Sequence, residues 1–297
     1  MMLEELYLNA YDKFGKKRFG IEEFARLGNL TIQSSKVLIH RMNKNKQLLR
    51  VEHGKYILMK PENFLKLKQL RKKNKKLYAL ALELFGIFPE LSVLVLYGSR
   101  VRGDADKYSD YDVLLILPEK RVETSVIKEK IEKKLNITLH LTIYSEKGYE
   151  TAILSEPYIR FWLAEGIMFD ETAIMQKPVP PISKMAYMEW WFSAETYVKT
   201  ANETKKTEYY FTALEILELI NAALKMEYDF KPVKSEIKRL VGERIIKKIR
   251  IGKKLDKKES KLLEKVCKKE LKSVNNFLCK IGKNEVDLYW EEKIIGG

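Results

Sequence analysis

Apolar and polar residues alternate in three different ways along the chain, and the first pattern covers residues 3–58. Apolar residues recur at helical spacing in LEELYLNAYDKF, GIEEFARLG and IQSSKVLIHRMNKNKQ, and the last stretch keeps Lys and Arg on its polar side. LLRVEHGKYILM predicts two short strands joined by a tight turn at His53-Gly54. This segment is therefore predicted to hold three short helices and a β-hairpin.

The second pattern interleaves helices and strands between residues 61 and 177. ENFLKLKQLRKKNKKLYALALELFG predicts one long helix with a basic first half and an apolar second half. SVLVLYG and DVLLILP have the length of buried strands, VETSVIKEKIEKKL is an amphipathic helix, and ITLHLTIY alternates as a strand does. EPYIRFWLAEGIMFD predicts a helix followed by a short strand. Interleaved elements of this kind favour a sheet covered by helices.

The third pattern, after the proline-rich KPVPPI, is helical throughout. Four stretches of bundle length follow one another with short polar joins: AYMEWWFSAETYVKTA, EYYFTALEILELINAALKM, SEIKRLVGERIIKKIR and ESKLLEKVCKKELKSVNNFL. With the two preceding segments, they predict an α+β protein of several domains that ends in an α-helical bundle.

Composition adds a strong positive charge to this picture. The 297 residues carry a formal net charge of +15, which indicates polyanionic partners such as nucleotides or nucleic acid. Heavy use of Lys and Glu is also typical of heat-adapted proteins, and composition alone leaves both explanations open. No apolar run approaches the length of a membrane span, so we expect no membrane partner and a cytoplasmic location. The two cysteines, Cys267 and Cys279, predict neither a zinc site nor a disulfide framework.

The stretch YGSRVRGDADKYSDYDVLLIL carries the clearest chemical signal. Asp110 and Asp112 stand one residue apart at the start of an apolar strand, so both are expected on one face of it. Two neighbouring carboxylates suit Mg²⁺, which prefers oxygen ligands and leaves room for substrate phosphates. Gly98 and Ser99 follow the preceding strand, where a turn offers backbone N–H groups and a hydroxyl to an anion. Metal and triphosphate would then share one site.

Gly98-Ser99, ten intervening residues and Asp110-Tyr111-Asp112 resemble the GS-x10-D-x-D motif of the nucleotidyltransferase superfamily that includes DNA polymerase β. The GSRVRG start is most similar to the minimal, or MNT-type, members. The resemblance implies that Asp110 and Asp112 hold two Mg²⁺ ions and that Gly98 and Ser99 bind the phosphates of an NTP. It also implies attack of an acceptor on the α phosphorus and release of pyrophosphate.

Three further residues are candidates for this site. Arg100 and Arg102 are expected to contact phosphates from the loop after Gly98. Active members of the superfamily usually carry a third acidic residue on the next strand, where ITLHLTIYS places His140. Histidine can accept a proton or ligate a metal, but it suits Mg²⁺ less well than oxygen does. His140 is therefore either a catalytic residue or a packed strand residue in a domain of weak activity.

The first segment resembles a winged helix-turn-helix, a class that binds DNA, RNA or protein partners. Its third helix and hairpin supply the candidate nucleic-acid contacts Ser35, Lys36, Arg41 and Lys55. The last segment resembles HEPN-type or substrate-binding bundles, although its lack of histidine excludes the HEPN nuclease motif. The predicted domains are thus a winged helix-turn-helix (1–60), a basic linker helix (61–90), a mixed-sheet nucleotidyltransferase domain (91–177) and a helical bundle (178–297).

Two functions remain open at this stage. The first is a Mg²⁺-dependent enzyme that transfers NMP from an NTP to RNA, a protein side chain or a small molecule. The second is a nucleic-acid-binding, antitoxin-like regulator whose nucleotidyltransferase domain is weakly active or inactive. Asp110, Asp112 and Ser99 favour the enzyme, whereas histidine at the third acidic position favours the regulator.

Overall fold

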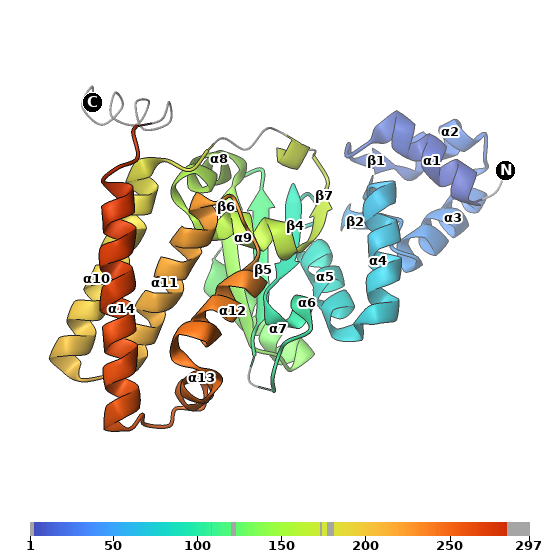
Figure 1. The fold of residues 1–297 in the computed structure, drawn as a ribbon. Helices are drawn as coiled ribbons and strands as arrows, with labels where there is room; N and C mark the ends of the chain where they lie inside the picture. Colours follow the sequence, from blue (N-terminus) through green and yellow to red (C-terminus); the bar gives the residue numbers. More distant parts are fainter. Residues whose placement is uncertain (1–2, 108, 120–122, 173, 177–180, 284–297) are drawn as a thin grey trace. The chain divides into compact units, whose positions relative to one another are not determined.

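Two compact units make up the computed structural model of the chain, which describes residues 3–107, 109–119, 123–172, 174–176 and 181–283. The first unit contains residues 1–149 and 165–178, and the second contains residues 150–164 and 179–297 (Figure 1). Each unit has its own hydrophobic core.

Three helices and a small antiparallel sheet form the N-terminal part of the first unit. The elements are α1 (Leu3–Phe14), β1 (Phe19–Gly20), α2 (Ile21–Gly28), α3 (Ile32–Lys44), β2 (Leu48–Glu52) and β3 (Lys55–Leu58). The strands lie in the order β1-β3-β2, and the β2-β3 hairpin turns at the expected His53-Gly54. The order of helices and hairpin agrees with the sequence pattern, and the assignment to the winged helix-turn-helix class stays a prediction.

The basic linker is two helices, so the prediction of one long helix over residues 61–90 is wrong. The structure has α4 (Pro61–Lys73) and α5 (Lys75–Ile87), separated at Asn74. Asn74 has extended backbone, and its side chain accepts hydrogen bonds from the N–H groups of Lys76 and Leu77 at 3.1 and 3.0 Å. Asparagine is among the best N-cap residues, and here it begins a second helix.

A mixed four-stranded sheet forms the centre of the first unit, with strand order β6-β5-β4-β7. Its strands are β4 (Val93–Tyr97), β5 (Tyr111–Leu117), β6 (Leu139–Ser145) and β7 (Ile167–Asp170). Strands β5 and β6 are parallel, and the other neighbours are antiparallel. The connecting helices are α6 (Ser99–Arg102), α7 (Thr124–Leu135), α8 (Glu146–Ser155) and α9 (Pro157–Glu165), and a short 3-10 turn covers Ile174–Gln176.

One face of this sheet is apolar and packs against helices. Helices α5 and α7 contact each other, and they contact β4 and β6 respectively (Figure 1). Leu94, Leu96, Val113, Leu115 and Leu117 are buried in the core on this face. Since side chains alternate along a strand, Tyr97 and Asp112 are directed to the opposite face.

A buried carboxylate connects the N-terminal elements to the sheet. The Glu171 side chain is completely buried after β7 and pairs with Lys16 Nζ at 3.0 Å. It also accepts hydrogen bonds from Asn63 Nδ2 at 2.8 Å and from the Lys60 backbone N–H at 3.2 Å. A buried charge needs partners of this kind, and those of Glu171 come from the connection between α1 and β1 and from the start of α4.

Helices α10 to α14 form most of the second unit. Their bounds are Lys184–Thr204, Glu208–Leu224, Phe230–Val241, Glu243–Arg250 and Lys257–Leu278. The sequence predicted one helix over SEIKRLVGERIIKKIR, and this is wrong because the chain breaks at Gly242, whose φ of 84° is unfavourable for other residues. No helix in the described part of the chain is long and apolar enough to cross a bilayer.

Helix α11 carries two glutamates whose ionisation is affected by burial. Burial raises the pKa values of Glu215 and Glu218 to about 7. Each of these carboxyl groups has a higher pKa in the folded chain than in the unfolded chain. Its contribution to the free energy of unfolding is fully present below the pKa of the unfolded chain, and it is lost as the pH rises through about 7.

We therefore expect Glu218→Gln to stabilise the protein at pH 8 by on the order of 2 kcal/mol, and to change little at pH 4.5. Thermal unfolding of the full chain at both pH values measures the difference. Glu203→Gln, at an exposed position of α10, is the matched control. An equal effect of Glu218→Gln at the two pH values would show that its ionisation does not affect stability.

Candidate functional site

Polar side chains of three neighbouring strands meet on the face of the sheet that α5 and α7 do not cover. In the register, Tyr97 of β4 lies opposite Asp112 of β5, and Asp112 lies beside His140 of β6. His140 Nδ1 is 3.2 Å from Asp112 Oδ1. The structure thus places His140 beside Asp112, on the side of the sheet where strand alternation predicted it.

Asp112 is in an environment that disfavours its charge. Its side chain is only 22% exposed, whereas that of His140 is 57% exposed. Burial is the main cause of a raised Asp112 pKa, and the nearby charge of Asp110 raises it further. The hydrogen bond from His140 opposes this shift only in part. The site therefore holds a carboxylate whose negative charge a bound cation would stabilise.

Asp110 lies immediately before β5 and is exposed. Asp110 and Asp112 are the two carboxylates that the sequence suggests as metal ligands, and metal binding by them stays a prediction. Among the described residues, no group of three or more His, Cys, Asp and Glu side chains is arranged to hold a metal ion. Because Mg²⁺ is commonly held by one or two carboxylates together with substrate phosphates, the two carboxylates still fit this ion.

Gly98 allows the loop after β4 to approach Asp112 closely. Its φ of 79° and ψ of −168° lie in a region that is essentially restricted to glycine. A Cβ at this position would be 2.0 Å from Asp112 Oδ2 and 2.8 Å from Asp112 Cγ. Ser99 follows at the start of α6 and is half-buried. The backbone of the glycine-serine turn and the carboxylate of Asp112 therefore share one site.

Both candidate phosphate-binding arginines have partners within the protein. Arg100 donates from Nε and Nη2 to the Ser109 carbonyl at 3.1 and 2.7 Å, and it lies over the Tyr111 ring. Arg102 Nη1 pairs with Glu165 Oε2 at 2.7 Å, and its Nε lies 3.3 Å from Asp104 Oδ1. These contacts order the loop between β4 and β5, and phosphate binding by either arginine stays a prediction.

Glu165 is a residue of this region that the sequence did not indicate. It is 63 residues away from Arg102 in the chain, and nothing in its local sequence marks it as a partner. The antiparallel pairing of β7 with β4, with Ile167 opposite Leu96, brings the start of β7 to the end of β4. The pair could be predicted only after this strand order is known.

The candidate nucleic-acid contacts of the first unit differ in exposure. Lys36, Arg41 and Lys55 are exposed, and their role stays a prediction. Ser35 is completely buried, so its inclusion in a binding surface is wrong. It lies on the inner face of α3, one helical turn from the buried Ile39.

The region that contains the glycine-serine and aspartate motif matches a known family model. Residues 67–171 match the family model of the nucleotidyltransferase domain. The matched region begins in α4 and ends just after β7, so it includes the whole sheet as well as Gly98, Asp110, Asp112 and His140. No curated protein matches the chain.

Proposed function

With residues 67–171 as a nucleotidyltransferase domain, we propose that the protein is a Mg²⁺-dependent enzyme that transfers NMP from an NTP to an acceptor. The close approach of Gly98 to Asp112 carries this proposal. It puts a turn without a side chain beside a carboxylate that a bound cation would stabilise, an arrangement suited to a triphosphate bound together with its metal.

Asp110 and Asp112 would hold up to two Mg²⁺ ions, which would stabilise charge on the attacking and leaving oxygens. The turn at Gly98 and Ser99 would bind the β and γ phosphates through backbone N–H groups and the Ser99 hydroxyl. The ion pair of Arg102 with Glu165 would keep the loop fixed in position. The role of the protein is then largely to position and orient the reacting groups.

His140 would receive the proton of the acceptor. When Nδ1–H donates to Asp112, the other ring nitrogen, Nε2, is left as an acceptor, and the ring is more than half exposed. The acceptor oxygen would bond to the α phosphorus while the bond to the bridging oxygen of pyrophosphate breaks. The hydroxyl proton would pass to Nε2.

Labelled nucleotides test this function. We expect label from α-³²P NTP, but not from γ-³²P NTP, to appear on an acceptor when the full chain is incubated with Mg²⁺ and total cellular RNA or lysate. The γ label should be released as pyrophosphate. Transfer of the γ label would identify a phosphotransferase instead. No transfer from any of the four NTPs would favour the regulator.

A further inference from the structure

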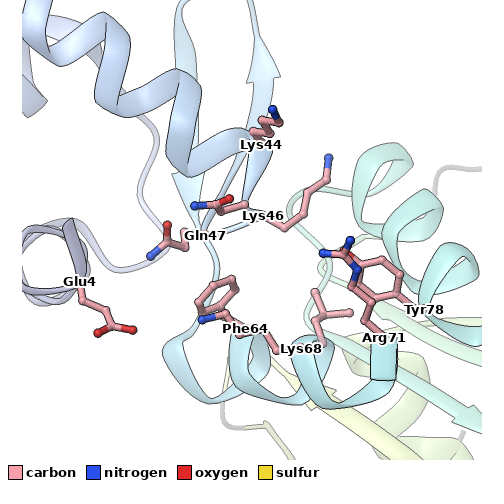
Figure 2. Close-up of a pocket in the computed structure, with 10 residues that line it drawn as sticks. Glu4, Lys44, Lys46, Gln47, Phe64, Lys68, Arg71 and Tyr78 are labelled. Atoms are coloured by element: carbon pink, nitrogen blue, oxygen red, sulfur yellow. The ribbon is translucent and has the colours of Figure 1, made fainter. Parts of the chain in front are cut away.

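A basic groove lies on the first unit, and none of the motif residues lines it. A cavity of about 440 Å³ is lined by Lys44 of α3, Lys46 of the α3-β2 connection, and Lys68 and Arg71 of α4. In Figure 2, Lys44 and Lys46 lie on one side, Lys68 and Arg71 lie on the α4 side, and Glu4 is the acidic residue at one end. A second cavity of about 780 Å³ shares Lys68 and Arg71 and adds Lys72 and Lys75.

These six residues, Lys44, Lys46, Lys68, Arg71, Lys72 and Lys75, define the basic groove. None of them forms an ion pair with another residue in the described part of the chain. Other lysines of the same unit are compensated, such as Lys16 by Glu171 and Lys134 by Glu83. Uncompensated like charges repel one another, and an anionic partner would remove this repulsion.

Aromatic and amide side chains also line the groove. Lys68 Nζ lies 4.3 Å from the centroid of the Phe64 ring, and the Arg71 guanidinium carbon lies 5.8 Å from that of Tyr78. Aromatic contacts of this kind hold a cation in place and leave N–H groups for a ligand. Gln47 is 3% exposed, and its Oε1 accepts no hydrogen bond from the described residues. Gln47 thus adds a buried polar group without a partner among the described residues to the lining.

We propose that the basic groove binds a polynucleotide through its phosphodiester backbone. Six cations along two adjoining cavities exceed what a single phosphate group would neutralise, and they match a chain of successive phosphates. The cations supply affinity that is independent of the nucleotide sequence. The groove differs from the surface of Lys36, Arg41 and Lys55, and binding requires neither NTP nor Mg²⁺.

The test is fluorescence anisotropy of the full chain with a labelled 12-nucleotide single-stranded RNA and with a DNA duplex, over a range of NaCl concentrations. The groove variant is Lys44→Gln/Lys68→Gln/Lys72→Gln. The control Lys261→Gln/Lys265→Gln/Lys272→Gln removes the same charge from exposed positions of α14. A second comparison variant, Lys36→Gln/Arg41→Gln, changes α3. Thermal unfolding checks that each variant is folded.

We expect the groove variant to bind RNA about 100-fold more weakly near 0.1 M NaCl, with a salt dependence of log K that is smaller by about 2, because three phosphate contacts are lost. The α14 control should change affinity by less than about threefold. The proposal would be overturned if the groove variant and the α14 control lost RNA affinity equally. It would also be overturned if only the Lys36→Gln/Arg41→Gln variant lost affinity. Binding of inorganic tripolyphosphate without binding of either oligonucleotide would overturn it as well.

Discussion

Gly98→Ala is expected to lower the rate of NMP transfer at least about 100-fold, the size of effect that a displacement of about 1 Å in a reacting group produces. The added Cβ would lie 2.0 Å from Asp112 Oδ2, 2.8 Å from Cγ and 3.1 Å from Cβ. Rotating the carboxylate alone does not relieve contacts with all three atoms. Asp112 must therefore move away from the turn, and its position beside His140 is lost.

Gly103→Ala is the control for backbone strain. Gly103 also has a positive φ, 87°, but a Cβ there would meet nothing within 4 Å. We expect this variant to lose about 1 kcal/mol of stability and to keep its transfer rate within a few-fold. Transfer rates and thermal midpoints of both variants give the comparison. Equal losses of activity would show that the approach to Asp112 is not needed.

A double-mutant cycle tests the contact itself. In an Asp112→Ala background the two nearest atoms are absent, so the stability cost of Gly98→Ala should be smaller than in the wild type. An identical cost in both backgrounds would assign the whole effect to the backbone conformation of Gly98.

The faces of the strands could be predicted from the sequence because a strand has a strict period of two. Alternation put Asp110 and Asp112 on one side of DVLLIL and His140 on the side of ITLHLTIYS expected to face them, and the structure pairs His140 with Asp112. Their register could not be predicted, since β5 and β6 are parallel and the whole of α7 lies between them. Long-range register depends on the packing of the complete sheet.

The wrong predictions arose where two different local structures have similar sequence patterns. Ser35 stands beside Lys36, and in a short amphipathic helix one position changes the direction by about 100°, enough to turn a side chain into the core. Asn74 and Gly242 lie inside stretches with continuous helical periodicity, and periodicity does not register a break of one residue. The partners of Arg102 required the order of the strands, which no local pattern contains.

Removal of the Asp112 charge is the most direct test of the account. We expect Asp112→Asn to abolish the effect of Mg²⁺ on NTP binding, because a partly buried carboxylate beside Gly98 is lost as a cation ligand. The variant should remain folded, since Asp112 has a raised pKa and its charge does not stabilise the fold. Asp106→Asn, at an exposed position of the same loop, is the matched control.

Calorimetric titration measures the affinity for each NTP, with and without Mg²⁺, in the wild type, Asp106→Asn and Asp112→Asn. For the wild type and Asp106→Asn, Mg²⁺ should tighten the binding of at least one NTP by about tenfold or more, equivalent to about 1.4 kcal/mol. For Asp112→Asn, the affinities with and without Mg²⁺ should be equal. Equal affinities in the wild type, or a full Mg²⁺ effect in Asp112→Asn, would contradict the assignment of this site.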